Sequence, residues 1–172
     1  MPPLPKPRFP FDYSVATEKR RLRAHALARG VPAKSRAHLL VATWNIANFG
    51  AHTRRPADLQ LIALILSWFD LIAVQECRED CGHLQDVVRY LKAPYRVLFS
   101  DSGGNNERLV FIYNSRQVKL LEKVGEIAFP PADYKHIKIP GVARKFDGFD
   151  RTPYLAAFKA GKTTFMFVNV HS

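Results

Sequence analysis

Hydrophobic positions along this chain form short runs, and three of these runs end in a polar residue. The runs HLLVATWN, LIAVQE and TTFMFVNVH end at Asn45, Glu76 and His171. Apolar runs of this length are typical of buried strands when turn residues bound them. A polar residue at the end of each run predicts that the three side chains lie along one rim of a β-sheet.

The segment between the first two runs has the pattern of an amphipathic helix, over residues 57–69. A strand over 38–45, this helix and a strand over 71–76 make a βαβ unit, whose strands are expected to be parallel neighbours with a right-handed crossover. Asn45 and Glu76 would then emerge side by side at the carboxyl ends of adjacent strands, where open α/β sheets bind ligands.

The remainder of the chain predicts one more short helix and several short strands. The helix is expected near 83–91, and the strands near 95–99, 108–113, 117–129, 151–159 and 163–171. The turn at Ala160-Gly161 predicts that the last two strands form a hairpin. Residues 130–150, with several Pro and Gly residues, predict an irregular loop.

Positive charge is concentrated at the start of the chain. The formal net charge is +11, and residues 1–40 contribute +7 of it. Such a balance favours polyanions, either nucleic acid or an anionic membrane surface. Residues 14–29 predict a helix. Its Arg cluster could clamp nucleic-acid phosphates, or it could be the solvated face of a helix that packs Val15, Leu22 and Leu27 on the body.

Composition indicates a globular protein, with 47% apolar and 12% aromatic residues. The two cysteines, Cys77 and Cys81, do not indicate a disulfide scaffold. Their spacing favours two inert thiols over a zinc site that includes His83. The start lacks the apolar region of a secretory signal, and the longest apolar stretch is too short to span a bilayer. We therefore expect a cytoplasmic protein with no membrane partner.

The acid that closes the second run is the strongest chemical indication. A carboxylate directly after apolar strand residues has to be solvated, paired or bound to a cation, because its burial alone is costly. Mg²⁺ binds one or two protein carboxylates together with water and substrate oxygens. Glu76 could equally be a helix cap or an ion-pair partner, and Asn45 a turn residue. Their joint placement in a βαβ unit favours the metal site.

His171 could be a general acid or base at the same rim, or a histidine satisfied in the core. As a catalytic group it needs a carboxylate to orient it, and Glu107 at the head of the LVFIY strand is the candidate. Glu107 could instead pair with Arg108. Arg151 could hold a substrate phosphate, or it could form a surface pair with Asp150 or Asp147.

The segments WNIANF, DLIAVQECRED, NNERLVFIYN, FDRTPYLAAF and FVNVHS, in this order, resemble the first half of the endonuclease/exonuclease/phosphatase superfamily. Among its branches they are closest to pancreatic deoxyribonuclease-like nucleases. The resemblance covers residues 38–172 and no part of the basic leader, 1–37. It implies an α+β (mixed α/β) fold, namely the amino-terminal half of a four-layer α/β/β/α sandwich, with one mixed β-sheet and flanking helices.

The resemblance also implies roles for particular residues. Asn45 and Glu76 match metal-site residues for Mg²⁺, with Mn²⁺ or Ca²⁺ as alternatives, and His171 with Glu107 matches a catalytic histidine and its carboxylate partner. The substrate-binding positions are Arg78, which matches an arginine directed at the DNA minor groove, Arg151, which matches a phosphate-contacting arginine, and Asn105. Pancreatic-type enzymes carry a Tyr in place of Asn105, so this position does not predict a duplex substrate.

The function implied is that of a metal-dependent phosphodiester hydrolase, a deoxyribonuclease-like endonuclease that acts on DNA rather than RNA. The motifs of the family's second half, GD-x-N and Ser-Asp-His, are not in the chain. We therefore expect 38–172 to be a partial domain, truncated at its C-terminus and inactive as a fragment. The alternatives are a phosphatase or lipid phosphodiesterase of the same superfamily, or a non-catalytic nucleic-acid-binding half-domain. An uncovered inner sheet face, lined by Phe165, Phe167 and Val110, predicts poor solubility.

Overall fold

The computed structural model of the protein describes residues 12–138, 140–141 and 143–171, so the first part of the predicted leader lies outside the described residues. Its helices are α1 (Val15–Ala28), α2 (Pro56–Leu66) and α3 (Gly82–Leu91), with 3₁₀ turns η1 (Gly104–Asn106) and η2 (Pro131–His136). Its strands are β1 (Val41–Phe49), β2 (Leu71–Arg78), β3 (Tyr95–Phe99), β4 (Glu107–Asn114), β5 (Val118–Glu126), β6 (Tyr154–Ala160) and β7 (Thr163–Asn169).

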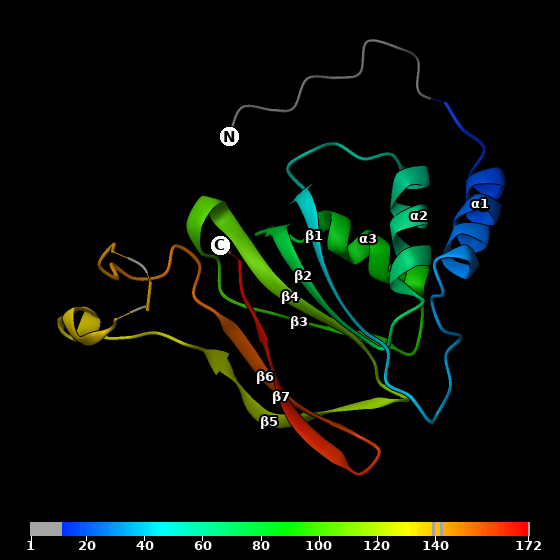
Figure 1. Cartoon of the computed structure of the whole chain (residues 1–172). Helices are drawn as coiled ribbons and strands as arrows, with labels where there is room; N and C mark the ends of the chain where they lie inside the picture. Colours follow the sequence, from blue (N-terminus) through cyan, green and yellow to red (C-terminus); the bar gives the residue numbers. More distant parts are fainter. Residues whose placement is uncertain (1–11, 139, 142, 172) are drawn as a thin grey trace.

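The first sheet has four strands in the order β1-β2-β4-β3. Strands β1 and β2 are parallel, with Val41 opposite Leu71 and Asn45 opposite Gln75, and α2 connects them. Strand β4 runs antiparallel to both β2 and β3, so this sheet is mixed. The predicted βαβ unit is confirmed, and so is a mixed sheet with flanking helices. Helices α2 and α3 cover one face of the sheet (Figure 1).

The remaining strands form a second sheet, antiparallel throughout, in the order β5-β6-β7. The predicted hairpin of the last two strands is confirmed. The prediction of one sheet is wrong in this respect, because β5 starts a separate layer on the face of the first sheet that the helices leave open (Figure 1). Periodicity identifies strands but does not say which of them pair.

Two apolar cores result from the alternation of side chains along the central strands. Ile72, Val74 and Val110 belong to the core under α2 and α3. Leu71, Ala73, Leu109 and Phe111 belong to the core between the two sheets, with Phe158 from β6.

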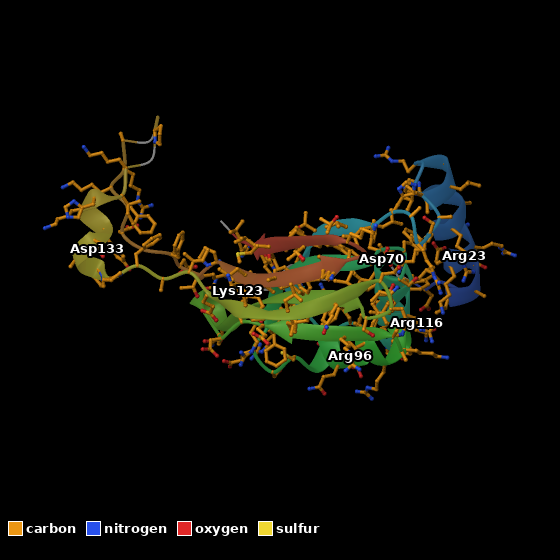
Figure 2. The ribbon with its side chains drawn as sticks, turned by 90° about the horizontal axis from the view of Figure 1, so that it is seen from below. Arg23, Asp70, Arg96, Arg116, Lys123 and Asp133 are labelled. Atoms are coloured by element: carbon orange, nitrogen blue, oxygen red, sulfur yellow. The ribbon has the colours of Figure 1, made fainter. Side chains whose placement is uncertain are left out.

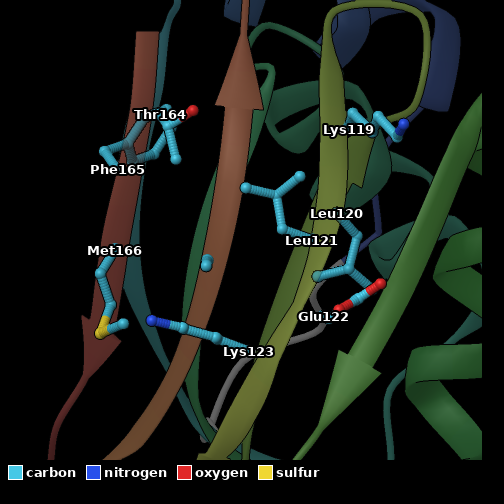
Figure 3. A pocket seen from close by; sticks show the side chains of 9 residues that line it. Lys119, Leu120, Leu121, Glu122, Lys123, Thr164, Phe165 and Met166 are labelled. Atoms are coloured by element: carbon cyan, nitrogen blue, oxygen red, sulfur yellow. The ribbon is translucent and has the colours of Figure 1, made fainter.

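The sequence predicted that the inner face of the sheet would be exposed, and this prediction is wrong. Val110 is fully buried, and Phe165 and Phe167 pack against the core between the sheets. The apolar face that stays exposed is the outer face of β5-β6-β7, where Met166 is 50% and Val168 43% exposed. A shallow hollow of about 750 Å³ lies on this face, as Figure 3 shows.

Helix α1 lies on the outside of α2 and confirms the helix predicted in the leader (Figure 1). The backbone N–H of Thr17 donates to the Ser14 hydroxyl, which caps the helix. Leu27 is 81% exposed, so its predicted packing on the body is wrong. Arg23 points away from the body in Figure 2. In the described part of the chain, no helix has the length and hydrophobicity needed to cross a bilayer.

Candidate active site

Three polar side chains that the sequence predicts at one rim lie together in the structure. The predicted end of the first strand at Asn45 is wrong, because β1 continues to Phe49. Asn45 Nδ2 donates to Glu76 Oε1 over 2.8 Å and lies 3.2 Å from His171 Nε2. His171 Nε2 lies 3.3 Å from Glu76 Oε1. His171 follows the end of β7, so the second sheet brings its imidazole to the rim of the first. None of the three is sealed in the core, since side chains of His171 and Glu76 keep 16% and 19% exposure.

The backbone at Glu76 is strained. Its φ is +60°, in the left-handed region that residues with a side chain rarely occupy. The register of β2 against β4 shifts between Val74 and Cys77, which makes a β-bulge around this residue. Such bulges redirect a side chain, and left-handed strain of this kind costs about 1–3 kcal/mol and clusters at functional sites. Glu76 therefore points to the rim instead of following the pleat of β2.

Three asparagines around the site share this backbone conformation. Asn48, Asn105 and Asn106 have φ values of +50°, +61° and +57°. Asn48 lies at the end of β1, where its backbone N–H donates to Glu76 Oε2 over 2.7 Å. Asparagine tolerates the left-handed region better than most residues, so the loops can turn tightly around the cavity.

The Glu76 carboxylate is held in its charged form. Burial alone would raise its pKa, but the hydrogen bonds from Asn45 and the Asn48 backbone, with the charges of His171 and Arg151, hold the pKa below its ordinary value. Both carboxylate oxygens are thus satisfied as acceptors, and the group is ready to face a cation at neutral pH.

Glu107 and Arg151 form an ion pair beside this cluster, with Glu107 Oε2 2.7 Å from Arg151 Nη2. Both side chains are almost fully covered, at 12% and 11% exposure. Arg151 also lies 3.2 Å from Asp150, as one alternative anticipated. The predicted hydrogen bond between Glu107 and His171 is not among the contacts of the described residues, and neither is a Glu107–Arg108 pair. Glu107 orients the arginine, and His171 faces Glu76.

Unsatisfied polar atoms gather at this site. In the described part of the chain, four buried side-chain atoms have no hydrogen-bond partner, and these include Arg151 Nε, His171 Nδ1 and Glu107 Oε2. Glu107 Oε2 lies 2.7 Å from Arg151 Nη2 in the ion pair, but the angles of this contact are not those of a hydrogen bond. When His171 Nε2 accepts from Asn45, Nδ1 carries the proton, so two N–H donors are left over. Buried donors without partners are uncommon in proteins, and an anionic oxygen would satisfy them.

A cavity of about 450 Å³ joins these groups. It is lined by Asn48, Ala51, Glu76, Arg78, Asn105, Asn106, Glu107, Arg151 and His171. The predicted substrate-binding residues Arg78 and Asn105 thus border the same space as Glu76 and His171. Arg78 is half-exposed and lies 3.6 Å from Asp80.

The oxygen donors at the rim are of the kind that hard divalent cations bind. Over the residues that the structure describes, no group of three or more His, Cys, Asp and Glu side chains is placed to hold a metal. One carboxylate with an amide and open space matches the few protein ligands that Mg²⁺ takes. Cys77 and Cys81 are buried free thiols, and burial raises the pKa of each. Each thiol is therefore held in its protonated form, which is the less reactive one.

Asn169 is the supporting residue that the sequence prediction missed. Its buried amide donates to the carbonyls of Val74 and Val110, each over 3.0 Å, and accepts from Gln75 Nε2 over 2.6 Å. These bonds join β7 to β2 at the bulge and fix the segment that carries His171. The sequence did contain a signal for this residue, because Asn169 follows Phe165 and Phe167 in the alternating pattern and so lies on the same face of the strand.

A scan of protein-family models and a search of curated proteins give no match to the chain. Solved structures do match. A conserved protein of unknown function from Enterococcus faecalis V583 has a TM-score of 0.53 and 18% identity, over 77% of this chain and 52% of that one. An endonuclease/exonuclease/phosphatase family protein from Bacteroides thetaiotaomicron has a TM-score of 0.51 and 21% identity, over 76% and 49%.

The human Nocturnin catalytic domain, solved with a bound sulfate anion, also matches, with a TM-score of 0.51 and 12% identity over 76% of this chain and 48% of that domain. The chain thus spans about half the length of the solved structures that it matches. Identities this low concern the fold alone. The chain therefore shares the fold of endonuclease/exonuclease/phosphatase family proteins over a length equal to about half of theirs.

Proposed function

We propose that this chain carries the metal- and phosphate-binding part of a metal-dependent phosphodiester hydrolase that acts on nucleic acid. The observation that supports this proposal is the meeting of Asn45, Glu76 and His171 within 3.3 Å at one rim, beside a covered arginine with an unused N–H. A divalent cation such as Mg²⁺, when bound at Glu76 and Asn45, would offset negative charge on the phosphoryl oxygens.

Each side chain has a definite task in this proposal. Arg151, held by Glu107, would bind a non-bridging phosphate oxygen through its free Nε–H. His171 would donate a proton to the leaving oxygen of the ester, as a general acid. Glu76 lies close enough to its Nε2 to stabilise the protonated imidazole that this step requires.

Nucleic acid is the proposed substrate because of charge. The chain carries a net charge of +11, and two arginines, Arg78 and Arg151, line the cavity. A positive charge of this size raises the affinity of a protein for nucleic acid, and this effect does not depend on the base sequence. DNA is proposed over RNA on the sequence resemblance around Arg78.

We further propose that this chain by itself turns over little or no substrate. It spans about half the length of the structures it matches, and catalytic groups that act as a unit fail together. Metal binding is therefore the sharper measurement for these 172 residues.

Titration of the chain with Mn²⁺, followed by electron paramagnetic resonance, tests the proposal. We expect one specific Mn²⁺ ion, displaced by excess Mg²⁺, and at least a tenfold weaker affinity in Glu76→Gln. Glu79→Gln is the matched control, since it removes an acid just outside the cavity lining, and it should bind the ion as the native chain does. Equal binding by the native chain and Glu76→Gln would refute the metal site.

Assays with plasmid DNA, single-stranded DNA, RNA and inositol phosphates, with and without Mg²⁺, then address the substrate. Glu76-dependent binding or cleavage of nucleic acid supports the proposal. Action on inositol phosphates alone would favour the phosphatase or lipid phosphodiesterase alternative. Nucleic-acid binding that is the same with and without Mg²⁺, and the same in Glu76→Gln, would favour a non-catalytic binding half-domain.

A further inference from the structure

The loop between β5 and β6 carries a small aromatic cluster of its own. Phe129, Tyr134, Phe146 and Phe149 form a chain of ring contacts, with centroids 5.1 to 6.1 Å apart. These residues belong to neither of the two cores. We call residues 127–150, as far as the structure describes them, the aromatic arm. It extends beyond the end of the second sheet, with Asp133 near its tip (Figures 1 and 2).

Two rings of the arm are partly exposed to solvent. Phe129 and Phe149 are each 41% exposed, although each also contacts another ring. Single exposed apolar residues are ordinary, but two partly exposed rings held in place by tilted and edge-to-face contacts with their neighbours form a surface suited to a flat ligand.

The arm borders the candidate active site. A cavity of about 780 Å³ is lined by residues 144–151, Pro153, Val170 and His171. Its lining thus includes both Phe146 and Phe149 of the arm and the proposed catalytic and phosphate-binding side chains, His171 and Arg151. A ligand that reaches from the site along this cavity meets the aromatic rings.

The base of the arm is held in place beside these groups. The backbone N–H of Gly104 donates to the carbonyl of Asp150 over 2.9 Å, and that of Ile127 donates to Pro153 over 2.9 Å. Gly148 has a φ of +106°, and a Cβ there would approach the Tyr134 hydroxyl to 2.9 Å. The arm is therefore anchored at both of its ends and packed tightly at Gly148.

The cavity wall carries the cations Arg144, Lys145 and Arg151 together with the acids Asp147 and Asp150, so cations outnumber acids there. Arg144 and Lys145 line the same cavity as Phe149, and both residues are exposed. Arg144 pairs with Asp147 over 2.6 Å, which leaves Lys145 as the more available cation. Rings interleaved with cations are how proteins bind single-stranded nucleic acid, because bases stack on the rings and phosphates face the charges.

We propose that the aromatic arm binds unpaired nucleotides next to the scissile phosphate, with bases stacked on Phe149 and Phe129, so that the substrate is single-stranded. This rests on the proposed function for the position of the phosphate at Arg151. Paired bases in a duplex have their faces covered by their neighbours and cannot stack on the arm.

The test measures binding without turnover. Anisotropy of a labelled dT₁₂ strand is recorded in EDTA, beside the same strand annealed to dA₁₂ and an abasic strand of equal length. We expect dT₁₂ to bind more tightly than either. Phe149→Ala should weaken dT₁₂ binding about 5- to 150-fold, the effect of one lost base–ring stack. Phe149→Tyr, which keeps a ring, should restore it.

The matched control is Tyr90→Ala, which removes a similarly exposed ring from α3. It should change dT₁₂ affinity by less than about twofold, the scale of a surface change away from any feature. If the abasic strand or the duplex binds as well as dT₁₂, or if Phe149→Ala binds normally, the arm is not a base-stacking site.

The two proposals can fail separately. Base-dependent binding without a Glu76-dependent metal would leave the arm as a binding site and remove the hydrolytic function. Metal binding that depends on Glu76, together with arm variants that bind dT₁₂ normally, would support the hydrolytic function and remove the arm as a binding site.

Discussion

Glu76 combines a left-handed backbone with a carboxylate that accepts from two donors. The bulge in β2 costs the fold some ladder pairing, and the hydrogen bonds from Asn45 and Asn48 offset part of that cost. At the residue scale, the site is therefore built by letting one strand depart from regular geometry so that its acid faces the rim.

The pKa shift of Glu76 makes a prediction about stability and pH. Because its pKa is lowered in the folded state, its stabilising effect is complete above the ordinary value of 4.5 and is lost as the pH falls through the lower folded value. Urea unfolding of the native chain and Glu76→Gln at pH 3 to 7 should show a difference in free energy of unfolding that grows with pH, to about 1–3 kcal/mol. A difference that stays constant over this range would contradict the shift.

Asn169 should be among the most sensitive polar positions. Asn169→Ala removes the amide that donates to the buried carbonyls of Val74 and Val110 and accepts from Gln75, so we expect a loss of about 2–5 kcal/mol in the free energy of unfolding. Thr164→Ala, an exposed change on the same strand, is the control and should stay within about 0.5 kcal/mol. Comparable effects of the two changes in chemical unfolding would rule out the supporting role of Asn169.

At the scale of elements, the leader is joined to the body by more than its helix. Lys34 Nζ lies 3.2 Å from the fully buried Asp70, at the start of β2, and donates to the Phe69 carbonyl over 2.6 Å. Asp70 also accepts from the Leu40 backbone and from the Asn114 amide. The predicted boundary after residue 37 thus places Lys34 in the leader and its buried partner Asp70 in the body.

Lys34→Met should therefore destabilise the body. The change keeps the apolar stem and removes the charge, leaving a buried carboxylate with two neutral donors, and we expect a loss of about 1–3 kcal/mol because Lys34 is partly exposed. Arg20→Met, on the exposed side of α1, should be close to neutral. Thermal unfolding monitored by circular dichroism would compare them, and an equal melting temperature for both variants would count against the buried pair.

At the scale of the whole molecule, the outer face of β5-β6-β7 is a sheet face with apolar side chains exposed to solvent. Leu121, Ala157 and Met166 line its hollow, with Lys123 beside them (Figure 3). Sheet faces of this kind associate with other apolar surfaces in water. The predicted poor solubility therefore keeps a physical basis, although the exposed face is not the one that the sequence suggested.

Self-association through this face is the expected behaviour of the chain in solution. Sedimentation velocity at increasing concentration should show growth in mass for the native chain, and Met166→Lys with Val168→Lys should reduce it. Thr163→Lys, a charge added at the first residue of the same strand, separates the effect of charge from that of the face. A native chain that stays monomeric throughout would show that the face does not drive association.

The sequence by itself determined the elements and the chemistry of the rim. Apolar runs with polar ends predicted β1, β2 and β7, and the βαβ spacing placed Asn45 beside Glu76, because both inferences depend only on local pattern and on a short crossover. Ser14 likewise marks the start of α1 by its own hydroxyl.

Only the tertiary structure decided how distant segments meet. The pairing of Glu107 with Arg151, the link from Asn169 to the bulge, and the separation of β5-β6-β7 into a second layer all join residues far apart along the chain. So does the approach of the aromatic arm to His171. Such contacts depend on which buried groups find partners once the layers pack, and a local pattern of polar and apolar residues carries no information about that choice.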